Sequence, residues 1–600
     1  MNREAKYIVV GGGLAGLMAA IRIAEAGGKA DVFSLVPVKR SHSVCAQGGI
    51  NAVLDVKGQE DTIWEHFDDT VYGGDFLAHQ PPVKSMVEEA PHIINMYDRM
   101  GVMFSRTPEG ILDQRYFGGV KKRRTAFAGA TTGQQLMYAL DEQTRPHEIS
   151  GAVTKYEGWQ FLGLVLDGTG RARGITALEL KTGEVRSFRG DAVLMATGGF
   201  GMVYGRSTTS TICNGGAASA IYQQGALLAN LEFIQIHPTA MPGEDKNRLM
   251  SESARGEGGR IWVPRDPADT RDPRQIPDAE RLYFLEERYP AYGNLVPRDI
   301  AAREIFHVCT EEGLGIGGEN VVYLDLTHMD ADYLTRRLGG ILEIYQKFAG
   351  ADPRQVPMKI FPSVHYSMGG IWVDYNQMTS IPGCFAAGEC DYQYHGANRL
   401  GANSLLSATY SGGVAGRTMR EWVAGQPDRA ADADASLFEA EQRRHEQINE
   451  TLLAETGTET PTDLHHELGV WMTRHASVVR NNKGLDELIG HLDEMLERYR
   501  TRLGLTDKGR WLNQQLAYAR DVGNMLQTAR AVARAARNRD ESRGSHYKPE
   551  FPERNDEKYL FTTKIAYDAA KDEPVLDYSE AIDVQHIAPR KRDYSVNKKA

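Results

Sequence analysis

The sequence has 600 residues, 25% of them charged, and a formal net charge of -11. A chain of this length exceeds what one hydrophobic core supports, so we expect roughly three or four domains. The pI near 5.9 argues against a nucleic-acid-binding protein, which would carry a basic face. The 41% of hydrophobic residues exclude a largely disordered chain. A large globular enzyme is the expected class.

The five cysteines lie far apart or at spacings other than CxxC: Cys45, Cys213, Cys309, Cys384 and Cys390. We therefore expect a reducing compartment, with no disulfide framework and no metal or iron-sulfur site in this chain. No apolar run reaches the roughly 20 residues of a membrane span. The N-terminal residues lead into a predicted strand without the features of a signal peptide. Any membrane contact is expected to come through another subunit.

The first predicted unit is a strand, a turn, a helix and a second strand over residues 7–33. YIVV is followed by GGGLAG, an alanine-rich run and KADVFS, which is the order of a βαβ unit. Residues 150–200 hold short alternating runs that close on the buried-strand pattern AVLMATGGFG. We expect this stretch to return to the first sheet, and GCFAAGE at 383–389 to resume the same pattern.

The middle and the end of the chain have different patterns. Residues 240–357 are dense in Pro, Asp and Arg around helical runs, which predicts an inserted domain. Beyond residue 435 the pattern is helical, and one apolar helix face carries Leu485, Leu488, Ile489, Leu492 and Leu496. The last 50 residues are polar and proline-containing, which predicts an extended arm on the surface or on a partner.

Gly11, Gly13 and Gly16 form a GxGxxG motif between the first strand and the first helix. This context is typical of a dinucleotide site, because the backbone must approach a pyrophosphate and point its N–H groups at it. The acidic residue that normally ends the second strand and binds ribose is replaced by Ser34. That replacement disfavours NAD more than FAD. The second glycine cluster, ATGGFG at 196–201, lacks the spacing of a nicotinamide site and is interpreted as packing near the flavin.

RSHSVCAQGGINAV at 40–53 resembles the flavoprotein subunits of succinate dehydrogenase and fumarate reductase. The resemblance continues through IQIHPTA, MSESARGEGG, NLVPRDI, FPSVHYSMGG, AAGE, HGANRLGANSLL and RDESRGSHYKPEFP. It implies an α/β fold: a Rossmann-like FAD-binding domain with an inserted α+β capping domain, then a helical bundle and an extended arm. We place the FAD-binding domain at 1–238 and 359–434, the capping domain at 239–358, the helical domain at 435–545 and the arm at 546–600.

The same motifs carry the residue types that a small dicarboxylate requires. Planar guanidinium groups and imidazole donors suit two carboxylates. By resemblance, Arg298 exchanges a proton with one substrate carbon while a hydride moves between the other carbon and flavin N5. Glu252 and Arg255 are its implied proton relay. The implied substrate-binding residues are His237, Ser251, His365 and Arg399, where Ser251 replaces the family's common Thr.

The resemblance also implies the cofactor contacts, including a covalent bond between FAD and His42. The pyrophosphate is assigned to Gly11, Gly12, Gly13, Leu14, Ala15 and Gly16, and the ribose to Glu389, with Ser34 at the usual ribose position. The ring and its linkage are assigned to Lys39, Arg40, Ser41, His42, Ser43, Gln47, Gly48 and Gly49, and the isoalloxazine edge to Ser404 and Leu405. Many family members carry an Asp near the adenosine where this chain has Gly215 or Gly216, so no FAD contact is assigned there.

Several alternatives remain open at this point. L-Aspartate oxidase shares AQGGI and the carboxylate-binding arginines but holds FAD without a covalent bond, so His42 discriminates between the two. A soluble fumarate reductase would need haem motifs, and no CxxCH is present. A scaffold that merely retains FAD would have no need of the Arg298, Glu252, His365 and Arg399 set. His395 stays open between a substrate or flavin contact and a structural role.

The cysteine pattern also bears on the partners. A flavin that exchanges two electrons with a dicarboxylate, and one at a time with a quinone, needs an electron relay that these cysteines do not provide. A separate iron-sulfur subunit is therefore implied. By resemblance, a membrane anchor with haem b and quinone lies beneath it, with menaquinone favoured. That arrangement places the chain peripherally at the cytoplasmic face of the bacterial cell membrane.

Overall fold

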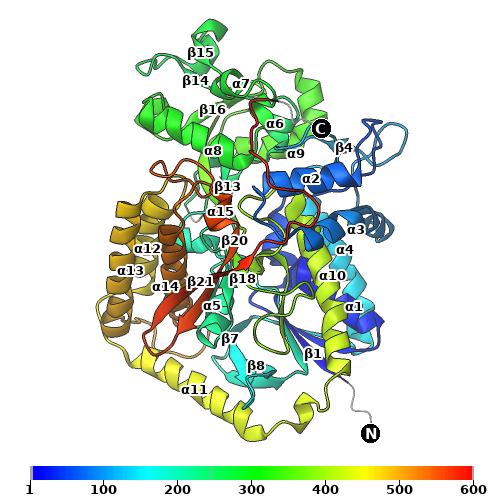
Figure 1. Ribbon diagram of the computed structural model, residues 1–600, viewed down its shortest axis with the longest axis vertical. Coiled ribbons are helices and arrows are strands. Elements are labelled where there is room, and N and C mark those ends of the chain that lie inside the picture. Colours follow the sequence, from blue (N-terminus) through cyan, green and yellow to red (C-terminus); the bar gives the residue numbers. More distant parts are fainter. Residues whose placement is uncertain (1–4, 245, 597–600) are drawn as a thin grey trace.

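The computed structural model describes residues 5–244 and 246–596 (Figure 1). Its central sheet is parallel and has the strand order β19-β10-β1-β2-β6. The strands are β1 Lys6–Val10, β2 Lys29–Ser34, β6 Val153–Glu157, β10 Ala192–Met195 and β19 Cys384–Ala386. The prediction that the chain returns twice to its first sheet is confirmed. Strands β1 and β19, which are nearly 400 residues apart in the sequence, therefore lie in one layer together with β10.

Helices cover this sheet, and two of them approach unusually closely. α1 (Leu14–Glu25) packs against α10 (Asn403–Ala424). A Cβ at Gly412 would lie 2.3 Å from the carbonyl oxygen of Ala15, and one at Gly416 would lie 2.8 Å from that of Ala19. Glycine is required because the two backbones are nearly in contact. The remaining helices of this domain are α2 Ile63–Gly73, α3 Gln80–Arg99, α4 Thr132–Ile149 and α5 Gly216–Gln223.

Two small antiparallel sheets complete the first domain. One has the order β3-β5-β4 and the other is the meander β7-β8-β9. Their strands are β3 Ile50–Asn51, β4 Gln114–Arg115, β5 Thr125–Ala126, β7 Trp159–Leu166, β8 Ala172–Glu179 and β9 Val185–Arg189. The meander begins directly after β6, and the Gly158 N–H donates to the Ser34 carbonyl at 2.8 Å. This bond joins the start of β7 to the end of β2.

The capping domain is built on a six-stranded sheet of order β13-β12-β17-β16-β14-β15. Its strands are β12 Ile234–Met241, β13 Arg248–Leu249, β14 Arg260–Pro264, β15 Arg281–Leu282, β16 Val322–Asp325 and β17 Met358–Ser367. Its helices are α6 Ser253–Gly256, α7 Phe284–Arg288, α8 Arg298–Phe306 and α9 Ala331–Ala349. β12 and β17 run across the expected boundaries at 238/239 and 358/359, so the two domains share continuous strands.

The region after residue 435 forms the helical domain. Its helices are α11 Ala435–Ala454, α12 Pro461–Ala476, α13 Asn482–Arg502 and α14 Gln514–Asn538. Along α13, Leu485, Leu488 and Leu492 are fully buried, Leu496 is 4% exposed, and Ile489 packs at the edge of the core. The predicted apolar face of this helix is confirmed.

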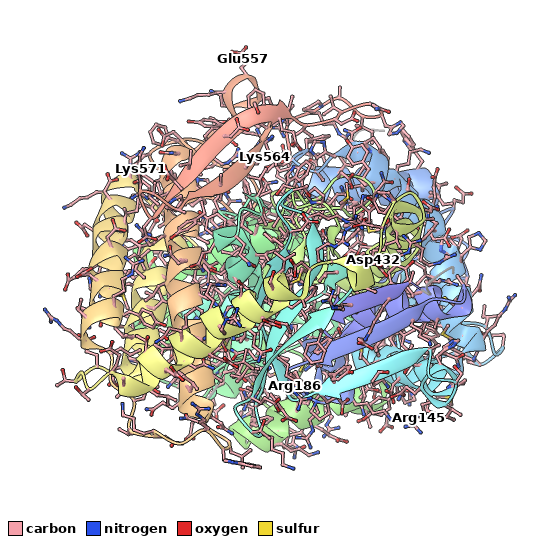
Figure 2. All side chains as sticks on the ribbon, turned by 90° about the horizontal axis from the view of Figure 1, so that it is seen from below. Arg145, Arg186, Asp432, Glu557, Lys564 and Lys571 are labelled. Carbon is pink, nitrogen blue, oxygen red and sulfur yellow. The ribbon has the colours of Figure 1, made fainter. Side chains whose placement is uncertain are left out.

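The C-terminal arm is only partly extended, which corrects the expectation from sequence. After the short helix α15 (Asp556–Tyr559), β20 (Phe561–Asp568) and β21 (Glu573–Ala581) form a hairpin. It joins β11 (Leu228–Ala229) and β18 (Gly370–Ile371) in one sheet. Figure 2 shows this hairpin, marked by Lys564, beside the helical domain. The buried residues of β20 are Thr562, Thr563 and Ile565, and because two of the three are polar, no clear apolar face is visible in the sequence here.

Beyond the hairpin, the chain runs as an extended strap from the FAD-binding domain to the capping domain (Figure 1). Arg590 pairs with Asp68 on α2 at 2.7 Å, and Arg592 pairs with Asp299 on α8 in a fork-like contact. The Tyr594 ring packs against Tyr292 of the capping domain at 4.9 Å. Among the described residues, no helix combines the length and apolarity that a membrane crossing would need.

Candidate functional site

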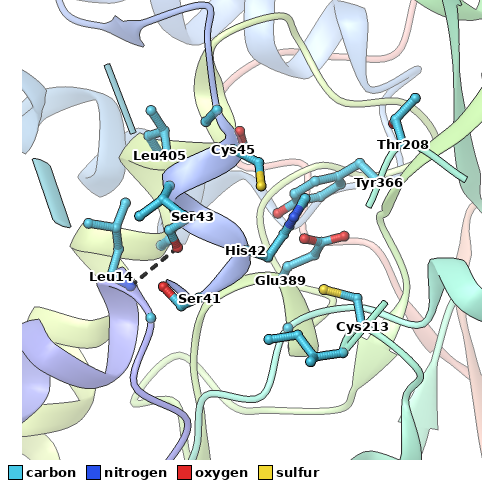
Figure 3. Close-up of a pocket in the computed structure, with 18 of the residues that line it drawn as sticks. Leu14, Ser41, His42, Ser43, Cys45, Thr208, Cys213, Tyr366, Glu389 and Leu405 are labelled. Carbon is cyan, nitrogen blue, oxygen red and sulfur yellow. Dashed lines mark hydrogen bonds between the residues drawn. The ribbon is translucent and has the colours of Figure 1, made fainter. Parts of the chain in front are cut away.

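A cavity of about 510 Å³ opens between the FAD-binding and capping domains. Its walls come from the turn after β1, the loop after β2, β12, α8, β17 and the start of α10. Figure 3 shows His42 projecting into it, with Glu389 and Tyr366 on one side and Ser43 and Leu14 on the other. The volume lies in the range of cofactor-binding cavities.

The turn after β1 forms a cradle that only glycine allows. Gly11 has φ +115°, and a Cβ there would lie 2.0 Å from the Ala196 carbonyl oxygen. Gly13, the residue before α1, has no side chain that could cap the helix, which leaves backbone N–H groups at this end for a phosphate. The Leu14 N–H faces Ser43 Oγ at 3.4 Å, the dashed line in Figure 3.

His42 is held as a neutral imidazole. The Ser210 N–H donates to His42 Nδ1 at 3.1 Å, so in the neutral form the proton sits on Nε2. Burial and the positive charge of Lys246 lower the pKa of His42 to about 4. The ring therefore stays uncharged at physiological pH, as a nucleophilic nitrogen requires.

Most predicted cofactor-binding residues line this one cavity, together with His42: Gly11, Gly12, Gly13, Leu14, Ala15, Ser34, Ser41, Ser43, Gln47, Gly48, Gly49, Glu389, Ser404 and Leu405. Three other predicted cofactor-binding residues, Gly16, Lys39 and Arg40, do not line the cavity. Gly16 allows the first turn of α1 to close, because a Cβ there would be 1.9 Å from the Gly11 carbonyl oxygen. Lys39 pairs with Asp141 at 3.0 Å, and Arg40 is exposed. FAD contacts at these three remain predictions.

At the substrate end, Glu252 and Arg298 form a buried ion pair. Arg298 Nε and Nη2 donate to Glu252 Oε2 at 2.9 and 2.7 Å. Arg255 Nη2 donates to the other carboxylate oxygen at 2.6 Å, from behind the cavity wall. Burial alone would raise the pKa of Glu252, but Arg298 and Arg255 lower it overall. The three predicted catalytic residues thus form one continuous hydrogen-bonded chain.

Gln235 is part of this site, and the sequence analysis did not identify it. Its Oε1 accepts from Arg298 Nη1 and from Arg399 Nη2, both at 2.9 Å. Gln235 lies two residues before His237 in β12, so the two side chains share one face of the strand. The available signal was an amide between Ile234 and Ile236, two positions before the assigned His237. Gln235 therefore fixes the spacing between the two guanidinium groups.

His237 and His365 line the cavity side by side and contact each other edge to face, with ring centroids 4.9 Å apart. The Thr239 N–H donates to His237 Nδ1 at 3.2 Å, which leaves Nε2–H as a donor. His365 Nδ1 pairs with the Thr208 hydroxyl at 2.7 Å. Burial first, and then Arg298, lower the pKa of both imidazoles well below the usual range. Both rings are neutral hydrogen-bonding groups near pH 7.

The remaining candidates separate into lining and supporting residues. Ser251 lines the cavity and pairs with Ser253 through their hydroxyl oxygens at 2.9 Å. Arg399 also lines it and is 2% exposed. His395 does not lie in the lining; its Nε2 pairs with Ser407 Oγ at 3.0 Å. His395 thus supports the start of α10 in this structure, and its contact with substrate or flavin stays an open prediction.

The residues present fit FAD. The glycine cradle at the N-terminus of α1 suits its pyrophosphate, and the cavity continues from there in two directions. One side carries His42 and the arginine-rich cluster, while the other runs along the end of β2 to Gln160 on β7. FAD has its pyrophosphate in the middle, so its flavin and adenosine halves require these two parts of the cavity.

Comparisons with known proteins agree with this geometry. The FAD binding domain family matches residues 6–405, and the fumarate reductase flavoprotein C-terminal family matches residues 465–594. The chain is 58% identical over 597 residues to the succinate dehydrogenase flavoprotein subunit of Bacillus subtilis, with 100% of both chains covered. It is 35% identical to the fumarate reductase flavoprotein subunit of a Serratia species, over 98% of this chain and 96% of that protein.

Solved structures show the same fold. A variant quinol fumarate reductase of Escherichia coli superposes with a TM-score of 0.90 at 32% identity and covers 99% of both chains. Mycobacterium smegmatis Sdh1 in complex with UQ1 gives a TM-score of 0.82 at 29% identity, over 98% of this chain and 95% of that one. The chain belongs to the flavoprotein subunit family of succinate dehydrogenase and fumarate reductase, and it is an FAD-binding oxidoreductase.

Proposed function

We propose that this chain interconverts succinate and fumarate, with Arg298 exchanging the proton. The observation that carries the proposal is the buried cluster at the flavin end of the cavity. Arg298 and Arg255 are hydrogen-bonded to one carboxylate, Glu252. Arg399 lies beside Arg298 and donates to an amide oxygen instead of a carboxylate, and all four residues are at most 5% exposed. A buried surplus of positive charge is costly unless an anion neutralises it. A dicarboxylate carries the two negative charges that this surplus requires.

Binding would use hydrogen-bond donors on both sides of the substrate. The His237 Nε2–H, the Ser251 hydroxyl and His365 are available to one carboxylate. The Arg399 guanidinium is available to the other, and a planar fork suits a carboxylate well. Because Gln235 accepts from both Arg298 and Arg399, the proton-exchanging group and the binding group keep a constant separation.

In succinate oxidation, FAD held by the glycine turn before α1 would supply the two-electron acceptor for the hydride that leaves one methylene carbon. Arg298 takes the proton from the other methylene carbon. Its own proton is passed beforehand to Glu252 Oε2, which accepts from Arg298 Nε and Nη2. Glu252 is bonded in turn to Arg255, whose Nη1 donates to the Asn294 carbonyl oxygen at 2.7 Å. Fumarate reduction follows the same path in reverse.

We infer that FAD is attached covalently through His42 Nε2. The Ser210 N–H occupies Nδ1, which leaves Nε2 for the bond. The lowered pKa keeps the ring neutral, so Nε2 would lose its single proton as the bond forms. In-gel flavin fluorescence of the acid-denatured 66.5 kDa chain tests the bond. Fluorescence in the wild type that is lost in His42→Ser supports it. A dark band from a folded yellow protein contradicts it and redirects the assay to L-aspartate.

We further propose that electrons leave through a separate iron-sulfur subunit to a membrane anchor with haem b and quinone. All five cysteines are free, and four of them are buried, so they offer no set of ligands for a relay. A similar solved structure is named as a quinol-fumarate reductase with menaquinol molecules. The chain would then sit peripherally at the cytoplasmic face of the bacterial cell membrane. The isolated chain should reduce an artificial dye with succinate, whereas quinone reduction should require the added subunits.

A further inference from the structure

Asp521 lies outside the FAD-binding domain and far along the chain from the motifs assigned to FAD, yet its side chain lines the FAD cavity. It belongs to α14 of the helical domain, and α14 packs against α5, which in turn packs against β7 (Figure 1). Gln160 Nε2 on β7 donates to Asp521 Oδ1 at 2.8 Å and to the Ala517 carbonyl oxygen at 3.2 Å. The carboxyl group is therefore held in place by an element of the FAD-binding domain.

The position of Asp521 corresponds to the adenosine side of the cavity. Gln160 is two residues beyond Gly158, whose N–H bonds the Ser34 carbonyl at the end of β2. In dinucleotide-binding domains, the ribose next to the adenine lies at the end of this second strand and is usually held by an acidic residue. Here β2 ends in Ser34, whose hydroxyl donates to the Val36 carbonyl oxygen at 2.6 Å. The end of the strand therefore offers no carboxylate, and Asp31 earlier in β2 pairs with Lys6 at 2.7 Å.

The loop that leads into α5 cannot provide a carboxylate at this place either. Gly215 has φ +72°, and a Cβ there would lie 2.7 Å from Phe200 Cβ. At Gly216 a Cβ would lie 2.8 Å from Asp521 Oδ1. The Asp521 carboxyl group thus occupies the space that a side chain at position 216 would need.

We propose that Asp521 binds the adenosine half of FAD, accepting a hydrogen bond from a ribose hydroxyl or the adenine amino group, so that the helical domain completes the cofactor site. The proposal needs only FAD binding and is independent of the reaction assigned to the substrate end. Burial raises the pKa of Asp521 to about 7, against the lowering effect of hydrogen bonds from Gln160 and Asn214. A buried carboxyl group whose loss of hydration is only partly offset gains from a further donor on the ligand.

The test uses the full-length chain in the His42→Ser background, where FAD is free to dissociate. Apoprotein is titrated with FAD, with ADP and with FMN, which lacks adenosine. Asp521→Ala should weaken FAD and ADP binding by about tenfold, the loss expected for one hydrogen bond to a buried acceptor, and leave FMN binding unchanged. Asp521→Asn, which keeps a carbonyl acceptor, should recover part of the affinity.

The matched control is Asn524→Ala. Asn524 lies one turn further along α14 and accepts a hydrogen bond from Gln223 of α5 at 2.9 Å, but it is absent from the cavity lining. Its apoprotein should lose thermal stability about as much as that of Asp521→Ala, with FAD affinity unchanged. Unaltered FAD affinity in Asp521→Ala would overturn the proposal. Equal losses for FAD and FMN, or an equal FAD loss in Asn524→Ala, would also overturn it by showing a general packing effect.

Discussion

Two buried clusters of arginine and glutamate lie in this protein, and their charge balance differs. The C-terminal cluster consists of Arg539, Arg543, Glu232 and Glu541, all fully buried and joined by bonds of 2.7 to 2.8 Å. It holds two positive and two negative charges. The active-site cluster of Arg298, Arg255, Arg399 and Glu252 holds three positive charges and one negative charge.

The hydrogen bonds show the same difference. Every side-chain nitrogen of Arg539 and Arg543 donates to a partner. In the part of the chain that the structure describes, Arg399 Nε has none, and burial followed by repulsion from Arg298 lowers the pKa of Arg399 to about 9. A balanced cluster holds segments together, whereas an unbalanced one is completed by its substrate.

The largest expected effect is on catalysis. Arg298→Gln removes the proton-exchanging group and should lower succinate-dependent dye reduction by about 10³-fold or more, with FAD content unchanged. The matched control is Arg303→Gln, five residues further along α8. Arg303 makes a long ion pair with Asp299, at 4.0 Å, so this variant should keep nearly full activity. Turnover within tenfold of wild type in Arg298→Gln would rule out its role as the proton donor and acceptor.

The next effect concerns the balanced cluster. Glu541→Gln leaves Arg539 and Arg543 with one counter-charge fewer in a buried site, which should lower the free energy of unfolding by about 3 to 5 kcal/mol. Denaturant unfolding measures this change. Because the cluster does not line the cavity, the KM for succinate should not move in the protein that remains folded. A shifted KM without loss of stability would contradict the assignment of a structural role to this cluster and a binding role to the other.

Arg399→Gln should act on binding rather than stability. Loss of a charged donor to a carboxylate costs about 2 to 3 kcal/mol, so the dissociation constant of a dicarboxylate inhibitor should rise roughly 30- to 150-fold. Unfolding free energy should stay equal or increase, since a buried unbalanced charge is removed. Isothermal titration and denaturant unfolding of the same preparation separate the two outcomes. Unchanged affinity would show that Arg399 does not contact the substrate.

The smallest effect is on pH dependence. Below pH 9 the Arg399 guanidinium is positive and attracts the dicarboxylate; above its pKa of about 9 the attraction is lost. In the free enzyme, kcat/KM should therefore fall as pH rises through about 9, by up to tenfold per unit. No matching fall is expected between pH 6 and 7 from His237 or His365, because both are already neutral there. The alkaline limb should vanish in Arg399→Gln.

Features that depend on local spacing could be predicted from the sequence. The glycine turn before α1, the apolar face of α13 and the return of β10 and β19 to the first sheet all follow from short periodic patterns. Family resemblance supplied the candidates at the substrate end, and the structure gathers most of them at one cavity.

Features that depend on contacts between distant segments could not be predicted. Gln235 was missed because its function requires Arg298 and Arg399 at the same oxygen, 63 and 164 residues away. Asp521 was missed because it reaches the cavity from another domain. The hairpin β20–β21 was missed because its buried face becomes apparent only when β11 and β18 supply the rest of the sheet.

The most direct test of the unbalanced cluster as a dicarboxylate site is anaerobic mixing of the oxidised protein with succinate while the flavin absorbance near 450 nm is followed. The account predicts bleaching with succinate, recovery of the absorbance on adding fumarate, and neither change with L-aspartate. Bleaching by L-aspartate alone, or none by succinate in protein with full FAD content, would contradict it.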